Sequence, residues 1–141
     1  IEFPPSGVSN PVALPGKRFN PRFEGVVSDY MTTVRRYAAE PVPGHRRFRG
    51  VMPSWDNTAR RQDRSYSYHD ASPGAFQAWL EWAMAVTREQ NPSGERFVFV
   101  NAWNEWAEGA YLEPDKRIGR GWLEAVRNAH DAHLWPAPEG T

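Results

Sequence analysis

Cysteine is absent from this sequence, and its absence removes two classes of small protein. Neither a disulfide framework nor a zinc site built on thiolates can form, although a chain without cysteine is compatible with oxidising and reducing compartments alike. An excess of charge is also missing, because 17 Lys and Arg residues balance 17 Asp and Glu residues. A neutral chain lacks the electrostatic footprint of a duplex-binding protein, so we expect no nucleic-acid partner.

Long apolar runs and several familiar motifs are missing too. The longest apolar stretches, such as residues 97–102, fall far short of the roughly 20 residues that cross a bilayer, so we expect no transmembrane segment. The sequence has no phosphate-binding glycine loop and no Gly-x-Ser-x-Gly elbow. Its four histidines show no metal-ligand spacing with acidic partners, and we expect neither a metal nor a cofactor.

Proline and tryptophan, by contrast, are plentiful, with 13 and 7 copies in 141 residues. Prolines and glycines crowd residues 1–22, which we expect to be a loop with at most a short strand over residues 1–3. The tryptophans supply a large apolar area in few residues. They are compatible with an aromatic core and, alternatively, with surfaces on which sugar rings or bases stack.

The spacing of apolar residues predicts three helices, over residues 29–39, 73–90 and 122–133. The first has Ser28 or Asp29 in position to cap it, and the second follows Ser72 and Pro73, the residue types that typically begin a helix. We expect loops over residues 53–71 and 103–120 and a tail over residues 134–141.

Two strands are predicted, over residues 48–52 and 97–102. The second contains four consecutive apolar residues, a pattern typical of a parallel strand that is buried on both faces. Strands that alternate with helices indicate an α/β fold, and we expect the two strands to be parallel with the helix over residues 73–90 as their crossover. A closed eight-stranded barrel takes roughly 250 residues, so the chain forms either a small open sheet or part of a barrel.

Two clusters of polar and aromatic residues follow the predicted strands, at the sheet edge where parallel α/β folds bind ligands. After the second strand come Trp103, Asn104 and Glu105, with Glu108 three positions further on. One cleft can hold both carboxylates, and glycoside cleavage needs two carboxyl groups about 5–9.5 Å apart. The alternative is that both glutamates are merely solvated, although a carboxylate between tryptophans directly after an apolar strand is costly without a function.

After the first strand come Trp55, Asp56 and Asn57, which combine an aromatic face with planar hydrogen-bonding groups, as recognition of a sugar ring requires. The alternative is a core tryptophan followed by an Asx turn. Arg60, with Arg61 and Arg64, forms a cluster that could hold a phosphate of a nucleotide or lipid-linked sugar. Alternatively, these arginines lie in a solvated loop and pair with nearby acids.

Two stretches of the chain closely resemble a known family. They read FVFVNAWNEWAEGAYLEP at residues 97–114 and MPSWDNTARR at residues 52–61. Both are similar to the WbsX-like domain, a relative of glycoside hydrolase family 99 that is found in bacterial polysaccharide-biosynthesis proteins. The opening Glu-Phe-Pro-Pro and the segment at residues 119–126 resemble it too, so the resemblance extends over almost the whole chain.

The resemblance implies that residues 1–141 are the C-terminal part of one (β/α)₈ barrel, whose remainder lies in the full-length chain. It implies a cytoplasmic bacterial enzyme that cleaves or transfers α-linked glycans, as a retaining endo-α-mannosidase does, with an oligosaccharide or polysaccharide as substrate. The family motif Glu-Trp-His-Glu-Gly is matched at residues 105–109 with Ala107 in place of His. By this resemblance Glu105 assists attack by the sugar's own 2-hydroxyl, and Glu108 is the general acid and base.

Two other functions remain open at this point. One is a glycan-binding remnant without turnover, in which Trp55, Asp56, Asn57, Trp103 and Asn104 bind sugar. The other is a glycosyltransferase in cell-surface polysaccharide biosynthesis that uses the arginine cluster for a phosphate.

Overall fold

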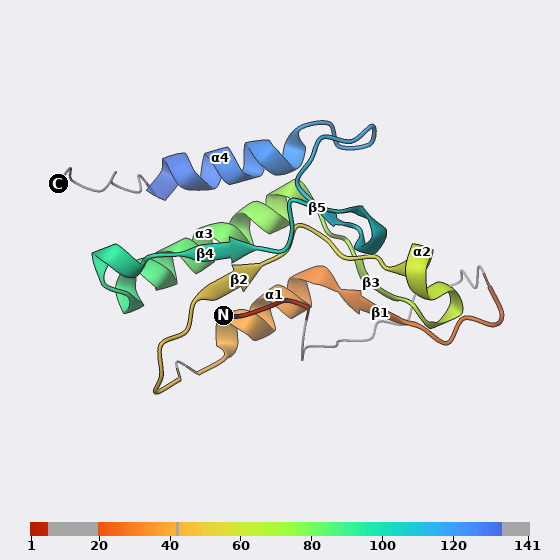
Figure 1. Cartoon of the computed structure of the whole chain (residues 1–141), viewed down its shortest axis with the longest axis horizontal. Helices are drawn as coiled ribbons and strands as arrows, with labels where there is room; N and C mark the ends of the chain where they lie inside the picture. The colour runs from red at the N-terminus through yellow and green to blue at the C-terminus, as the bar shows by residue number, and fades with distance from the viewer. Residues whose placement is uncertain (6–19, 42, 134–141) are drawn as a thin grey trace.

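Short strands and longer helices alternate along the chain and form an α/β fold (Figure 1). The computed structural model describes residues 1–5, 20–41 and 43–133. Within these residues, six strands form three separate two-stranded sheets. Most of the proline-rich segment and the predicted tail over residues 134–141 lie outside the described residues.

The two predicted strands form one of these sheets. Strand β2 (Arg49–Val51) pairs in parallel with β4 (Val98–Val100), so that Arg49 lies opposite Val98. Helix α3 (Pro73–Gln90) lies between them in the sequence and packs against both. Its first turn is capped by Ser72, whose hydroxyl accepts the Ala75 N–H at 3.3 Å. The predicted strands, their parallel pairing and this helix are therefore confirmed.

A second parallel sheet was not predicted. It pairs β1 (Val26–Asp29) with β3 (Tyr66–His69). The prediction of a continuous loop over residues 53–71 is therefore wrong, because that segment also contains helix α2 (Thr58–Arg61) and a 3₁₀ turn, η1 (Gln62–Arg64). Strand β3 has the alternation of a half-buried strand, but four residues with three hydroxyls and an imidazole carry little hydrophobic signal.

Helix α1 (Tyr30–Ala39) begins where β1 ends. The Asp29 carboxylate accepts the backbone N–H of Thr32 at 2.6 Å, and hydrogen bonds from the side chain and the backbone of Thr32 lower the pKa of Asp29 from its usual value. A carboxylate in this position satisfies a free N–H of the first turn and interacts favourably with the helix dipole. The predicted helix over residues 29–39 and its cap are confirmed.

The core is aromatic and lies between the helices and β2. Trp79 and Phe76 on α3 and Trp122 on α4 (Gly121–His133) are almost completely buried. The rings of Phe76 and Trp122 meet edge to face with centroids 5.9 Å apart, an arrangement that stabilises aromatic pairs. Helices α3 and α4 lie side by side (Figure 1). The core interpretation is thus confirmed for two of the tryptophans, and the helix predicted over residues 122–133 is confirmed.

In the part of the chain that the structure describes, no helix has the length and apolar character of a membrane span.

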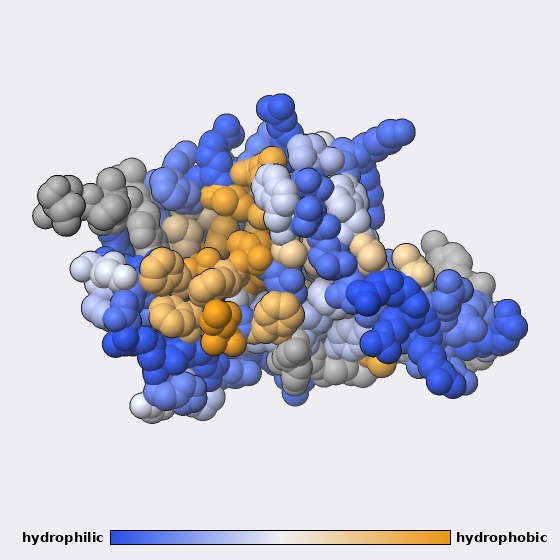
Figure 2. All heavy atoms as spheres, viewed as in Figure 1, coloured by the Kyte–Doolittle hydropathy of each residue, from blue (hydrophilic) through white to orange (hydrophobic). Residues whose placement is uncertain are grey.

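Strand β4 is not buried on both faces, and that prediction is wrong. The side chains of Phe97 and Phe99 are 54% and 43% exposed. Among the described residues β4 pairs only with β2, so its other edge has no neighbouring strand. Phe48 contacts both exposed rings edge to face. Figure 2 shows apolar side chains gathered on this side of the molecule, whereas the end that carries α2 is mostly hydrophilic.

The N-terminal residues do not form a strand, but they are held firmly against β2. The Glu2 N–H donates to the Phe48 carbonyl at 2.9 Å, and the buried Glu2 carboxylate lies 2.8 Å from both Arg47 and Arg49. The Asn101 side chain donates to the Pro4 carbonyl at 2.8 Å. A Cβ on Gly50 would lie 2.2 Å from the Glu2 carbonyl oxygen, so only glycine permits this close approach.

Candidate functional site

The loop that follows β2 is fixed by backbone contacts with β3. The Tyr68 N–H donates to the Trp55 carbonyl at 2.9 Å, and Asp56 and Ser67 form an antiparallel bridge. The Asn57 N–H donates to the Tyr66 carbonyl at 3.2 Å. The strand that sequence analysis missed therefore determines where the first cluster of candidate residues lies.

The segment after β4 forms a small hairpin, so the prediction of a plain loop over residues 103–120 is wrong. Strand β5 (Asn104–Glu105) pairs with β6 (Ala110–Tyr111), and the turn between them is η3 (Trp106–Glu108). Gly109 closes the turn at a φ of 62°, a left-handed conformation that favours glycine. We call residues 104–111 the glutamate hairpin.

The two segments share one rim, as expected for neighbouring parallel strands. The Asp56 N–H donates to the Glu108 carbonyl at 2.8 Å, and the Ser54 hydroxyl donates to the Gly109 carbonyl. A Cβ on Gly109 would lie only 2.8 Å from the Asp56 nitrogen. The glutamate hairpin is therefore in close contact with the segment that carries Trp55 and Asp56.

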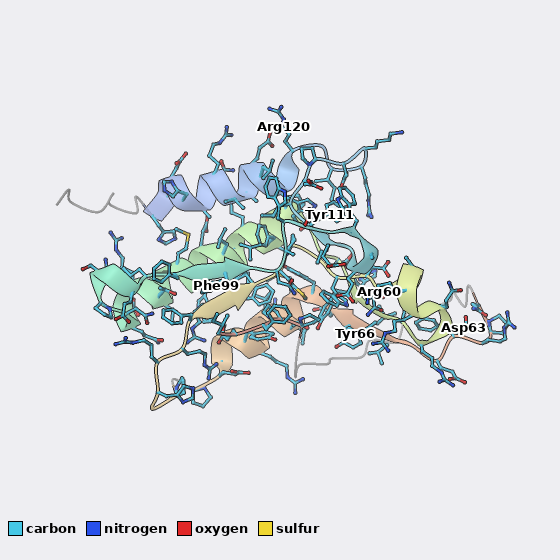
Figure 3. All side chains as sticks on the ribbon, viewed as in Figure 1. Arg60, Asp63, Tyr66, Phe99, Tyr111 and Arg120 are labelled. Carbon is cyan, nitrogen blue, oxygen red and sulfur yellow. The ribbon has the colours of Figure 1, made fainter. Side chains whose placement is uncertain are left out.

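Glu108 makes an ion pair with Arg60 across this rim. One guanidinium nitrogen lies 2.7 Å from a carboxylate oxygen, and the side chains are 56% and 21% exposed for Arg60 and Glu108 respectively. Such a partly exposed pair contributes little to stability, typically about 0–1 kcal/mol. It does orient the Glu108 carboxylate, because a charge-assisted hydrogen bond has a preferred direction. In Figure 3 Arg60 lies away from Phe99, toward the end of the molecule near which Asp63 is labelled.

The other arginines of the predicted cluster do not join Arg60. Arg64 lies 3.2 Å from Glu24, and both side chains are strongly exposed. Arg61 is exposed on α2. Arg60 and Arg64 therefore pair with separate acids, as the solvated-loop alternative predicted, rather than converging on one position.

Glu105 lies on β5 with its side chain exposed. In the hairpin register Glu105 is opposite Ala110, and Asn104 is opposite Tyr111. Successive strand residues point to opposite faces, so Glu105 shares a face with the buried Ala110 and Asn104 shares the other face with Tyr111. Trp103, directly before the hairpin, is 53% exposed.

The three residues after Ser54 have different environments. Trp55 is half-buried against the core, and Asp56 is exposed. The Asp56 carboxylate accepts the Thr58 N–H at 2.9 Å, which confirms the Asx turn. Asn57 is buried, and its side-chain oxygen accepts the Tyr66 N–H at 2.7 Å. Asn57 therefore holds the loop against β3, and its oxygen is engaged in the fold.

Sequence analysis missed an aromatic pair in the glutamate hairpin. The rings of Trp106 and Tyr111 stack with centroids 3.8 Å apart and an interplanar angle of 15°. The Trp106 indole N–H donates to Glu113 at 2.6 Å. The sequence does place an aromatic residue on either side of Gly109, which could have indicated that the two rings meet across a turn. The two-residue strands that bring the rings together are too short to predict. Among the described residues there is no group of three acidic or histidine side chains that could hold a metal.

Comparison with known proteins places the chain in a family. Residues 7–126 match the family model described as glycosyltransferase WbsX. The chain belongs to the WbsX family. Over 130 residues it is 42% identical to the uncharacterized protein WxcX from two strains of Xanthomonas campestris pv. campestris, B100 and ATCC 33913. The resemblance to WbsX-like domains is therefore confirmed, and the description of the family connects the chain with glycan chemistry.

The match to WxcX includes 92% of this chain but 19% of each relative. The chain thus spans about a fifth of the length of these curated relatives. No solved structure matches the chain significantly.

Proposed function

We propose that this WbsX chain supplies the two-glutamate rim of an enzyme that cleaves or transfers α-linked glycans in polysaccharide metabolism. The observation that carries the proposal is the contact between the two predicted clusters. The Asp56 N–H donates to the Glu108 carbonyl at 2.8 Å, so a carboxylate-bearing hairpin lies beside an aromatic and polar segment. A carbohydrate enzyme needs both, because the carboxylates act on the bond while aromatic and polar groups hold the sugar.

In the first half of the proposed reaction, Glu105 accepts the proton of the sugar 2-hydroxyl as its oxygen attacks the anomeric carbon. The bond from that carbon to the leaving oxygen breaks, and Glu108 gives its proton to the leaving group. In the second half, Glu108 takes a proton from water or an acceptor hydroxyl, whose oxygen attacks the anomeric carbon while the bond from that carbon to the 2-oxygen breaks. Glu105 then returns its proton to the 2-oxygen. Each carboxylate ends in the state in which it began.

The Arg60 ion pair fits the second half of this cycle. An ion pair implies an ionised Glu108, which is the form that accepts a proton from water or an acceptor. In the first half Glu108 must carry a proton, and the guanidinium is then free to contact a substrate oxygen. This gives Arg60 two roles in the proposal, as the orienting partner of Glu108 and as a binding residue.

The sugar-binding residues in this proposal are Trp55, Asp56, Trp103 and Asn104. Asn57, whose oxygen is bonded to the Tyr66 N–H, contributes mainly by holding the loop, with its side-chain NH₂ as the group left for a sugar hydroxyl.

The wider fold belongs to the same proposal, in which residues 1–141 form the C-terminal part of a (β/α)₈ barrel. Two parallel strand pairs with helices between them support it, as does the open edge of β4 beside the exposed Phe97 and Phe99. Exposed edges and contiguous apolar side chains are normally covered in native proteins. In the complete protein we expect the outer amides of β4 to be protected from hydrogen exchange. Rapid exchange there would contradict the barrel proposal.

Substitution of each glutamate in the complete protein tests the proposed chemistry. We expect Glu108→Gln to slow cleavage of substrates with poor leaving groups by roughly two to four orders of magnitude, the usual scale of general acid–base catalysis. The loss is smaller on activated aryl glycosides, which need no proton. Glu105→Gln slows cleavage of both substrate types, because the attacking 2-hydroxyl must lose its proton whichever leaving group the substrate carries.

Glu124→Gln is the matched control, because Glu124 is an exposed glutamate on α4. The role assignment is wrong if Glu108→Gln slows both substrate types equally while Glu105→Gln has no effect. If neither substitution matters, the glutamates are not catalytic, and the chain is better described as a glycan-binding module.

The family description favours a second candidate, a glycosyltransferase that uses a nucleotide sugar. In that case Arg60 would leave Glu108 and bind a phosphate. Calorimetry with nucleotide sugars and with oligosaccharides separates the two candidates. Binding of the nucleotide sugar that is lost in Arg60→Gln supports the transferase, whereas binding of oligosaccharides alone supports the two-glutamate mechanism.

A further inference from the structure

Trp106 is an exposed tryptophan whose ring is held in one orientation. Its side chain is 48% exposed, in contrast to Trp79 and Trp122, which are 0% and 2% exposed. One face of the indole stacks on Tyr111, and the indole N–H donates to Glu113 at 2.6 Å. The ring is therefore fixed by a face contact and an edge contact while much of it remains open to solvent.

The ring under Trp106 is fixed in turn. The Tyr111 hydroxyl donates to one oxygen of Asp115 at 2.7 Å. The other Asp115 oxygen accepts the backbone N–H groups of Arg117 and Ile118, at 2.6 and 2.5 Å. Burial, together with the hydrogen bond to Asp115, raises the pKa of Tyr111 to about 12. Tyr111 thus keeps its proton, and hence its bond to Asp115, throughout the physiological pH range.

This support has no counterpart in an ordinary core tryptophan. Burial alone fixes a core ring, and the apolar area removed from water stabilises the fold. Because Trp106 is half exposed, it gains less of this stabilisation than a core tryptophan does. Its side chain is nevertheless restricted to one rotamer by the stacking on Tyr111 and the hydrogen bond to Glu113. A rigid, exposed aromatic ring is a typical binding surface, because little further entropy is lost when a ligand docks on it.

The hairpin register separates this surface from Glu105. Asn104 lies opposite Tyr111 and shares its face, whereas Glu105 shares the other face with Ala110. A carboxamide that can bond to sugar hydroxyls is thus on the face of the stacked rings. In Figure 3 Tyr111 lies toward the same end of the molecule as Arg60, away from Phe99.

We propose that Trp106, held by Tyr111 and Glu113, is the stacking platform of a second sugar subsite, which binds a hexopyranose unit other than the one that reacts. The inference rests on the proposed function, because it assumes a glycan at Glu105 and Glu108. It extends that function by assigning Trp106 to a sugar unit beyond the one that reacts. The substrate is an oligosaccharide long enough to contact both faces of the glutamate hairpin, rather than a single glycoside.

The test compares short and long substrates in the complete protein. Steady-state rates are measured with an aryl monoglycoside and with oligosaccharides of increasing length, for the unaltered protein, Trp106→Ala and Trp106→Phe. We expect Trp106→Ala to raise KM for the long substrates roughly 2- to 12-fold, which corresponds to the energy of one aromatic contact. KM and kcat for the monoglycoside stay unchanged. Trp106→Phe, which keeps a ring but loses the bond to Glu113, gives an intermediate effect.

Phe23→Ala is the control, because Phe23 is an aromatic residue 41% exposed outside the glutamate hairpin. Equal losses on short and long substrates in Trp106→Ala would overturn the proposal, since they indicate that Trp106 only holds the hairpin. Unchanged KM on all substrates would overturn it as well. If Trp106→Ala does not fold, Trp106→Phe and Glu113→Gln decide, with hydrogen exchange over the hairpin as the check on its structure.

Failure of the underlying function gives a different result. If the unaltered protein turns over none of these glycans, the catalytic proposal fails, and calorimetry then tests the platform alone. An affinity that rises with oligosaccharide length in the unaltered protein but not in Trp106→Ala supports the platform without catalysis. Absence of glycan binding in the unaltered protein overturns both proposals.

Discussion

Gly109 allows a sharp test of how the glutamate hairpin is held, because the chain contains a matched glycine. Gly109 and Gly119 have nearly the same left-handed φ, 62° and 65°. A Cβ on Gly119 would meet nothing within 4 Å, whereas a Cβ on Gly109 would lie 2.8 Å from the Asp56 nitrogen. Alanine at either position costs roughly 1–2 kcal/mol for the left-handed backbone. Only Gly109→Ala also pushes the hairpin away from Asp56.

The additional cost of Gly109→Ala has two parts. Loss of the bond from the Asp56 N–H to the Glu108 carbonyl costs about 0.5–1.5 kcal/mol. Overpacking against the Asp56 backbone costs about 1–3 kcal/mol. Together these terms make local opening of the hairpin easier by roughly 1.5–4.5 kcal/mol in Gly109→Ala than in Gly119→Ala.

Hydrogen exchange over residues 103–112 measures this difference directly, because local opening limits the exchange of hairpin amides. At tenfold per 1.4 kcal/mol, we expect exchange at least about 10-fold faster in Gly109→Ala than in Gly119→Ala. In the proposed enzyme, turnover should fall in the same order, since Glu108 moves with the hairpin. Equal exchange in the two variants would refute the reasoning, because it would mean that the contact with Asp56 does not hold the hairpin.

Three further predictions concern binding, the buried ion pairs and acid stability. Trp55→Ala should weaken oligosaccharide binding by roughly 1–3 kcal/mol in calorimetry. Unchanged affinity would mean that Trp55 only packs against the core and does not bind sugar. Arg49→Met should lower the free energy of unfolding in urea by about 3 kcal/mol or more, because it breaks the ion pair between Arg49 and Glu2, whose side chains are only 3% and 6% exposed. Arg46 is exposed, and Arg46→Met should lower the free energy of unfolding by about 1 kcal/mol or less. Because the pKa of Asp29 is lower in the folded state than in the unfolded state, the ionised carboxylate stabilises the fold at pH values above its unfolded-state pKa. This stabilisation is lost as the pH falls through the folded-state pKa. The stability lost in Asp29→Ala should therefore shrink as pH drops below about 4, and a pH-independent loss would contradict the cap.

The predictable parts of the fold are those in which local signals agree. Helix α3 has its cap, its Pro73 and its apolar spacing within one continuous segment, so neighbours in the sequence specify it. Strands β1 and β3 are only four residues long, and each depends on a partner about 40 residues away for its hydrogen bonds. Pairing of that kind leaves almost no local signal in the sequence.

The candidate site divides in the same way. Its location after β2 and β4 was predictable, because parallel strands bring their carboxyl ends to one edge. The ion pair between Arg60 and Glu108 joins residues 48 positions apart and follows from β3, which holds the intervening loop. The burial of Asn57 depends on the same strand. Side-chain partners could not be predicted where the backbone that positions them was itself missed.

The hydrogen bond between Asn101 and the Pro4 carbonyl bears on how the chain folds as it is synthesised. It joins residues 97 positions apart, whereas the contacts of Glu2 with Arg47 and Arg49 span 45 and 47 positions. At about 5–20 residues per second, the ribosome needs roughly 5–20 s to produce the segment between Pro4 and Asn101. The N-terminal residues can therefore dock on β2 well before β4 exists. During that interval one edge of β2 is without its neighbour, and a nascent chain with an unpaired strand is open to aggregation until Asn101 has emerged.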